Sequence, residues 1–66
     1  MPIVQVETWK GKSPEVRKAL AEALTQAVVK HIGCEPQAVT VILNEVDKGD
    51  WFIGGKDANE LFPDKC

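Results

Sequence analysis

The sequence predicts an α/β fold: a single β-α-β unit with parallel strands and a short C-terminal β-segment. Two stretches rich in β-branched residues, 3–9 and 38–46, flank one stretch of helical periodicity. Strands joined through a helix of this length run parallel, with a right-handed crossover. The chain has 66 residues, so we expect one domain over residues 1–66.

The first strand is expected over residues 3–9, before the break at Gly11. Ser13 then serves as an N-cap, and Pro14 suits the first helical position, where its missing N–H has no partner to lose. Gly33 is a natural residue just after a helix, which gives a helix of about 19 residues. Apolar residues recur at three- and four-residue steps as one stripe: Val16, Ala19, Leu20, Ala23, Leu24, Ala27, Val28 and Ile32.

The second strand is expected over residues 38–46, followed by a turn at 47–50. Residues 51–53, Trp-Phe-Ile, form the short β-segment, and the glycine pair 54–55 closes it with a turn. One helical turn is expected to begin near Asp57.

This arrangement leaves apolar surface uncovered. On the second strand Val39, Val41 and Leu43 alternate with Thr40, Ile42, Asn44 and Val46, so neither face is fully polar. One helix covers only one face, and a chain this short buries only about 60% of its unfolded surface. We therefore expect a homo-oligomer, in which dimers share a continuous sheet and further copies cover the remaining apolar surface.

Composition excludes several classes of function. The hydrophobic fraction of 44% and charged fraction of 27% are typical of a globular protein. A net charge of -2 argues against a nucleic-acid partner, and no apolar run is long enough to cross a membrane. Cys34 and Cys66 are expected to be reduced thiols, which favours a cytoplasmic protein. With one His and no C-x-x-C motif, no metal site is expected.

Few side chains suit catalysis. His31 falls in the last helical turn, where a structural or solvated role is favoured, and Cys34 has only that His near it as a base. Glu7 and Glu45 lie on different strands and are interpreted as a solvated pair of acids. Nothing else supports the glycosidase chemistry that two carboxylates can perform.

The remaining candidate is Pro2. Removal of Met1 would leave Pro2 with a free secondary amine held in a rigid ring. An α-amino group titrates near about 7.7–8.0, so it can exchange protons close to neutral pH. Taken alone, the feature is weak, because a proline after the initiator Met is common.

The order of several short motifs is more specific. Residues 2–6 (PIVQV) and 9–15 (WKGKSPE) open the chain, and residues 39–46 (VTVILNEV) precede Gly-Asp-Trp at 49–51 and Ile-Gly-Gly at 53–55. Together they resemble the 4-oxalocrotonate tautomerase family, over residues 2 to 56 with no insertion. The resemblance implies a tautomerase-like β-α-β protomer, sheets joined across subunits, and usually a trimer of dimers.

The resemblance also implies an activity and a site. Pro2, as the freed N-terminus, would move a proton in the enol–keto tautomerisation of an unsaturated 2-oxo or 2-hydroxy acid, without a cofactor. The family's two substrate-binding arginines correspond to Lys12 and Thr40, and its pocket aromatic corresponds to Trp51. Lys12 keeps the charge but lacks the planar fork of an arginine, and Thr40 carries no charge.

Alternatives remain open at this stage. Lys12 would otherwise be a solvated loop lysine, and Trp51 a subunit-interface anchor. A dehalogenase- or hydratase-like relative would need an acid to activate water, and Glu7 and Glu45 are the strand acids available. Because Thr40 lacks the charge of the arginine expected at its position, a non-catalytic oligomeric scaffold or binding module is a further hypothesis.

Overall fold

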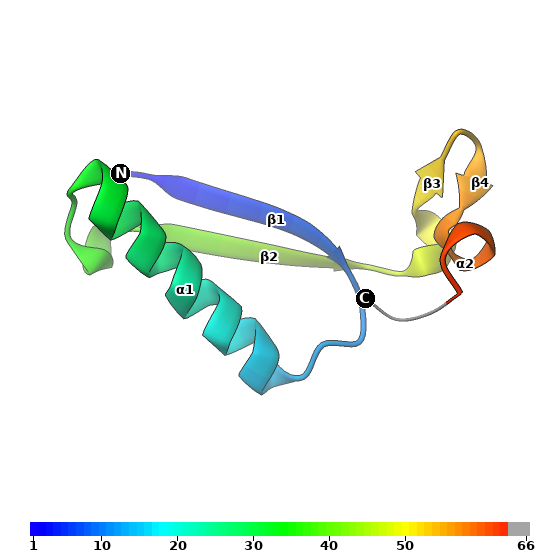
Figure 1. The fold of residues 1–66 in the computed structure, drawn as a ribbon, viewed down its shortest axis with the longest axis horizontal. Coiled ribbons are helices and arrows are strands. Elements are labelled where there is room, and N and C mark those ends of the chain that lie inside the picture. The colour runs from blue at the N-terminus through cyan, green and yellow to red at the C-terminus, as the bar shows by residue number, and fades with distance from the viewer. Residues whose placement is uncertain (64–66) are drawn as a thin grey trace.

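Residues 1–63 are described by the computed structural model, in which two parallel strands pack against one long helix (Figure 1). The strands β1 (Ile3–Trp9) and β2 (Thr40–Val46) pair with Ile3 opposite Thr40. The predicted β-α-β unit with parallel strands is therefore confirmed. The molecule extends only 14 Å along its shortest axis, which fits one helix layer on a single sheet.

The helix α1 (Pro14–Ile32) begins and ends where the sequence predicts. The Ser13 hydroxyl oxygen accepts a hydrogen bond from the Val16 backbone N–H at 3.3 Å. Gly33 has a φ of 86°, and its N–H donates to the Val29 carbonyl at 2.9 Å. Because a side chain strains this left-handed conformation, glycine is the residue suited to end the helix here.

The face of α1 that packs on the sheet coincides only in part with the predicted apolar stripe. The half-buried helix residues are Arg17, Ala21, Leu24, Thr25, Val28 and Val29. The other members of the stripe are exposed: Val16, Ala19, Leu20, Ala23, Ala27 and Ile32. The helix therefore retains apolar surface that the protomer does not cover.

The sheet face opposite α1 is open. The residues that alternate onto it are exposed: Ile3, Gln5, Glu7, Thr40, Ile42 and Asn44. The exposed fractions of Ile3 and Ile42 are 62% and 38%. Within residues 1–63 the one fully buried apolar side chain is Ala58. The described part of the protomer thus has no core beyond this side chain, in line with the short length of the chain.

The predicted start of β2 is wrong. Pro36–Ala38 forms the 3₁₀ turn η1, so the strand begins at Thr40 and not at Ala38. The Val39 N–H donates to the Pro36 carbonyl at 3.1 Å and closes this turn. A proline at the first position of a helical turn is favoured because its φ is already fixed near the helical value.

Four short elements follow β2 and lie beyond its carboxyl end (Figure 1). They are η2 (Lys48–Asp50), β3 (Phe52–Ile53), β4 (Lys56–Asp57) and α2 (Ala58–Leu61). The predicted β-segment is confirmed as β3, which pairs with β4 as an antiparallel hairpin that sequence reasoning missed. The predicted helical turn is also confirmed, because Asp57 caps α2 by accepting from the Glu60 N–H at 3.0 Å.

Neither helix of residues 1–63 is long and apolar enough to cross a bilayer. Within the same residues Cys34 is a free thiol, half-buried at the loop after α1. The expectation for Cys66 concerns a residue outside the described part of the chain.

Candidate active site

Pro2 lies directly before β1 and is fixed at one end of the sheet. Its carbonyl accepts a hydrogen bond from the Thr40 backbone N–H at 3.0 Å, and the residue is half-buried. Met1, which is 96% exposed, makes the Pro2 nitrogen an amide. An exposed Met1 is accessible to an aminopeptidase, and its removal would convert that nitrogen into a secondary amine.

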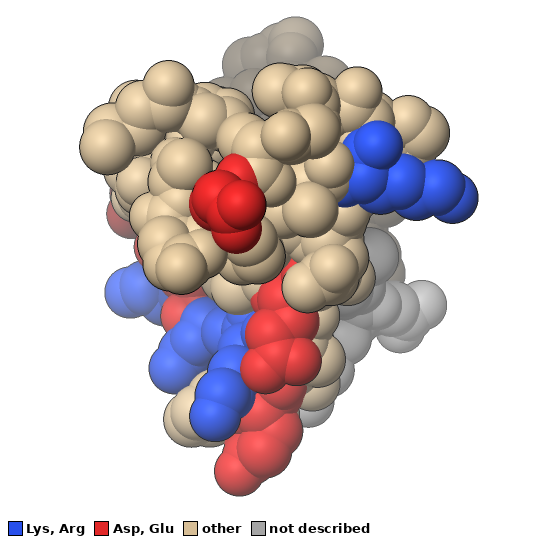
Figure 2. Space-filling view, turned by 90° about the vertical axis from the view of Figure 1, so that its left-hand side faces the viewer, with Lys and Arg blue, Asp and Glu red and all other residues tan. Residues whose placement is uncertain are grey.

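Thr40 shares this end of the sheet with Pro2 and brings no charge to it. The upper part of the surface at this end is mostly uncharged but carries one acidic and one basic side chain, and further charged side chains gather below it (Figure 2). Thr40 itself is exposed on the open face, opposite Ile3. Thr40 itself therefore offers a hydroxyl and no positive charge to a carboxylate, whereas Lys30 and His31 lie in the last turn of α1 at this end.

Lys12 lies at the opposite end, in the loop between β1 and α1. Its ammonium donates to the Trp9 carbonyl at 3.2 Å, and its side chain is half-buried. Arg17 reaches from the first turn of α1 and donates to the Lys12 carbonyl at 3.2 Å. The loop that carries Lys12 is thus held from both sides, which argues against a freely solvated lysine.

The same Arg17 guanidinium forms an ion pair with Glu45 at 2.8 Å. The second oxygen of the Glu45 carboxylate, Oε2, is buried and has no hydrogen-bond partner. Arg17 therefore links the loop of Lys12 to a half-buried acid on β2. Sequence reasoning missed this role of Arg17.

Replacing Arg17 by Gln should lower the melting temperature by several degrees and raise KM through the loosened Lys12 loop. The unpaired Glu45 carboxylate costs about 1–2 kcal/mol, since the group is only partly solvated. Thermal unfolding and steady-state kinetics measure the two effects. Lys18→Gln makes the same charge change on the exposed side of α1. If both variants behave alike, the proposed bracing of the loop is wrong.

Aromatic side chains gather beside Lys12. The rings of Trp9 and Trp51 meet edge to face at 5.9 Å between centroids, and Phe62 lies 5.6 Å from Trp9. The Lys48 ammonium sits 4.6 Å from the Trp9 ring centroid. Trp9 thus links Trp51, which packs against its ring, to Lys12, which donates to its carbonyl. Sequence reasoning treated Trp9 only as a strand residue.

A cavity of about 420 Å³ opens at this end of the sheet. The described residues that line it are Trp9, Lys10, Gly11, Lys12, Ser13, Val16 and Lys48. Among residues 1–63, the lining combines an indole ring and an aliphatic side chain with ammonium groups and includes no carboxylate. Such a combination suits a small organic anion with an apolar body.

The predicted site residues form two groups that one protomer cannot bring together. Pro2 and Thr40 lie at the start of the strands, and Lys12 and Trp51 lie beyond their ends. Seven strand residues at about 3.3 Å each separate the groups by roughly 23 Å. A site that uses both groups needs a second copy of the chain.

The other residues considered for a functional role occupy exposed or structural positions. His31 is exposed, and the glycine pair forms the β3–β4 turn, with φ values of 60° and 83°. Glu7 accepts from the Asn44 side chain at 2.9 Å, whereas Glu45 faces Arg17. Residues 1–63 hold no group of three or more potential metal ligands.

The expected pairing of Glu7 with Glu45 is wrong. The register places Glu7 opposite Asn44, and Thr8 opposite Glu45. Since neighbouring strand residues point to opposite faces, the two acids lie on different sides of the sheet. Glu7 and Glu45 therefore cannot form a two-carboxylate site within one protomer.

Comparison with known proteins identifies the family to which this fold belongs. A family model described as "Tautomerase enzyme" matches residues 2–59. The 2-hydroxymuconate tautomerase of Comamonas testosteroni is 38% identical over 61 residues, which cover 92% of this chain and 97% of the relative.

Two solved structures share the fold closely. TomN, a 4-oxalocrotonate tautomerase homologue of the tomaymycin biosynthetic pathway, has a TM-score of 0.85 at 35% identity, covering 96% of this chain and 100% of the other. A heterohexameric 4-oxalocrotonate tautomerase from Chloroflexus aurantiacus has a TM-score of 0.85 at 30% identity, covering 92% and 98%. The chain therefore belongs to the tautomerase family and is an isomerase of the 4-oxalocrotonate tautomerase type.

Proposed function

We propose that the enzyme interconverts the enol and keto forms of an unsaturated 2-oxo acid by proton transfer at Pro2, after removal of Met1. The observation that carries this proposal is the placement of Pro2 at the start of β1, fixed through its carbonyl by Thr40. A base whose position is set by the backbone loses little freedom when substrate binds.

The chemistry needs only a base, a positive charge and an apolar wall. The Pro2 amine accepts the hydroxyl proton of the enol, and as an ammonium it protonates the substrate carbon. The C=C bond becomes single, the C–O bond becomes a carbonyl, and the amine is regenerated. The Lys12 ammonium stabilises the oxyanion or the carboxylate, and the neighbouring aromatic rings, Trp51 among them, exclude water.

The site is proposed to lie between copies of the chain. The roughly 23 Å between Pro2 and Lys12 within one protomer supports this arrangement. The open sheet face and the exposed apolar residues of α1 supply surface for contacts between copies. Among the relatives of known structure is a heterohexamer, and a hexamer is the assembly we propose here.

No specific observation favours either of the two alternative functions, a hydratase-like enzyme or a non-catalytic scaffold. A hydratase-like reaction needs an acid that activates water, but Glu7 is held by Asn44 and Glu45 by Arg17. A silent scaffold would follow from the uncharged Thr40, yet the cavity beside Lys12 is lined by basic and aromatic groups.

The test combines intact mass with an enol assay. Protein whose mass lacks Met1 should convert phenylenolpyruvate to phenylpyruvate, monitored by the loss of enol absorbance. Protein that retains Met1 should be inactive, because an amide nitrogen cannot accept the proton. Equal activity of the two forms would refute a role for the Pro2 amine.

A further inference from the structure

The free edge of β1 is a place where a second copy of the chain can pair. β1 pairs with β2 along one side, and within residues 1–63 no strand lies along its other side. α1 packs mainly against β2, so β2 lies between β1 and most of the helix (Figure 1). The seven residues of β1 include no proline and no lysine, the residues that most often protect an exposed edge. This edge is therefore open to a further strand.

The direction of the backbone groups fixes how two copies can pair at this edge. The Pro2 carbonyl accepts from the Thr40 N–H, and the Lys10 N–H donates to the Val46 carbonyl, so both residues face β2. Backbone groups alternate in direction along a strand, so the odd-numbered residues of 3–9 direct theirs to the free edge. A two-fold axis pairs two identical edges antiparallel, because every contact between the copies is reciprocal.

The antiparallel pairing that uses all seven residues of β1 is centred on Val6. It places Ile3 opposite the partner's Trp9, and Pro2 opposite the partner's Lys10. Residues opposite each other between the hydrogen-bonded pairs have Cα atoms about 4.5 Å apart. The segment that follows β1 in one copy therefore lies beside Pro2 of the other, which closes the gap of roughly 23 Å within one protomer.

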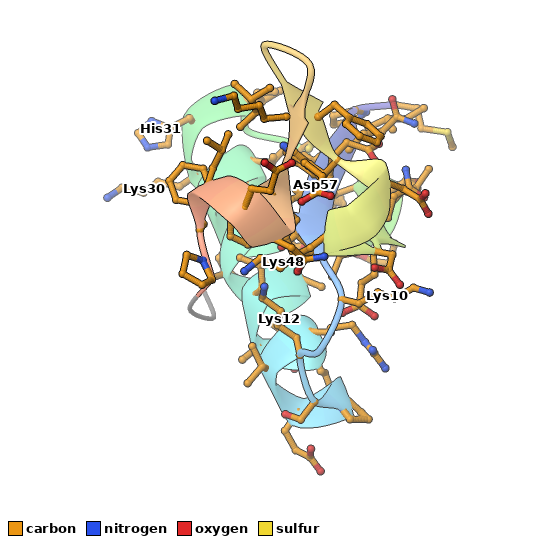
Figure 3. The ribbon with its side chains drawn as sticks, turned by 90° about the vertical axis from the view of Figure 1, so that its right-hand side faces the viewer. Lys10, Lys12, Lys30, His31, Lys48 and Asp57 are labelled. Atoms are coloured by element: carbon orange, nitrogen blue, oxygen red, sulfur yellow. The ribbon has the colours of Figure 1, made fainter. Side chains whose placement is uncertain are left out.

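Lys10 combines a fixed backbone with an available charge. Its N–H donates to the Val46 carbonyl at 3.0 Å, and its side chain is exposed. Within residues 1–63 the Lys10 ammonium takes part in no hydrogen bond or ion pair. Figure 3 shows Lys10 and Lys12 on opposite sides of the loop that joins β1 to α1. The positive charge of Lys10 is therefore available to an anion outside its own protomer.

The other cations near these elements are placed less well for such an anion. Arg17 is paired with Glu45 at 2.8 Å. Lys30 lies in the last turn of α1, where the helix dipole favours a positive charge. Lys10 is the cation that pairing of the β1 edges brings directly opposite Pro2.

We propose that Lys10 of each copy binds the substrate carboxylate over Pro2 of the neighbouring copy, and supplies the charge that Thr40 lacks. This inference rests on the proposed function for its substrate, but binding of the carboxylate does not need the Pro2 amine to exchange a proton. A ligand that cannot tautomerise therefore tests it separately. Lys10 is a binding residue here and takes no proton.

The first experiment compares a charged ligand with its neutral analogue, 3-phenylpropanoate with 3-phenylpropanamide, on the processed protein. The two indole N–H signals of Trp9 and Trp51 report binding by NMR. Lys10→Gln should weaken binding of the carboxylate about fivefold and leave binding of the amide unchanged, whereas Lys10→Arg should bind both within about twofold of the unaltered protein. Lys30→Gln removes another exposed lysine and is the matched control, which should bind both ligands normally. Loss of structure would weaken both ligands alike, so the difference between them isolates the charge.

The second experiment tests the pairing of β1 with a disulfide. Val6 lies opposite its own copy in the partner, at a Cα separation of about 4.5 Å, which a disulfide can span. In a chain that carries Cys34→Ser and Cys66→Ser, Val6→Cys should form a covalent dimer on oxidation. Val4→Cys changes another half-buried valine of β1. It lies opposite the partner's Thr8, roughly 13 Å from its own copy, and should stay monomeric on a denaturing gel.

The outcomes separate the two proposals. If Lys10→Gln binds 3-phenylpropanoate like the Lys30→Gln control, the role of Lys10 is refuted, whatever the activity. If Val6→Cys forms no more covalent dimer than Val4→Cys, the pairing that brings Lys10 to Pro2 is wrong. If the Pro2 amine proves dispensable for the reaction while Lys10→Gln still loses only the carboxylate, the proton-transfer proposal alone fails.

Discussion

Pro2→Ala should lower kcat/KM for enol ketonisation by a factor of about 10²–10⁴, the usual contribution of a positioned general base. The processed variant still has a terminal amine, but it loses the rigid ring and the secondary amine. The alanine keeps the backbone hydrogen bond from Thr40 to its carbonyl, but its nitrogen is free to rotate about φ, which the proline ring fixes. Steady-state kinetics with phenylenolpyruvate on protein of verified mass measures this loss.

A second proline, in the exposed turn before β2, serves as the control for Pro2. Pro36→Ala changes the same residue type in the exposed turn η1, so its kcat/KM should stay close to that of the unaltered enzyme. Circular dichroism should show that both variants keep their secondary structure. A folded Pro2→Ala protein with undiminished kcat/KM would exclude the amine as the base.

Ile42→Lys should abolish assembly and leave the chain largely unfolded at micromolar concentration. Ile42 lies at the middle of the open sheet face and is 38% exposed in the protomer. Covering the 38% of this side chain that stays exposed contributes about 1 kcal/mol per copy, and a lysine there would bury an unpaired charge in every copy. Because the described part of the protomer has no core beyond Ala58, losing the contacts between copies removes the main source of stability.

Sedimentation velocity and thermal melting at several protein concentrations measure this effect. Gln26→Lys introduces the same charge on the exposed side of α1 and should leave the oligomer and its melting temperature nearly unchanged. An Ile42→Lys protein that stays oligomeric, with a melting temperature like that of Gln26→Lys, would show that this sheet face is not an interface.

Local signals in the sequence were sufficient for most of the fold. The bounds of α1 follow from Ser13, Pro14 and Gly33, because caps act through hydrogen bonds to nearby backbone. The start of β2 was wrong by two positions, since Pro36 favours a 3₁₀ turn over extended chain. The β3–β4 hairpin was missed because each strand has only two residues, too few for a periodic pattern.

The site was harder to predict because it depends on register and on contacts between distant segments. A shift of one residue in strand pairing moves a side chain to the other face, which is why Glu7 and Glu45 were paired wrongly. The family resemblance gave Pro2, Lys12 and Trp51, whose roles stay predictions. No spacing rule joins Trp9 to Lys48, which meet only because η2 folds back over the end of β1.

The separation of Pro2 from Lys12 along the strands has a consequence for oligomers that contain two variants of the chain. In an assembly where each site takes its proline from one copy and its lysine from another, every chain serves two sites at once. A cell that makes two versions of the chain would combine them in one oligomer. One defective chain would then impair two sites, one through its proline and the other through its lysine. Conversely, two chains that are each inactive alone, one lacking the proline and the other the lysine, would restore some sites when mixed.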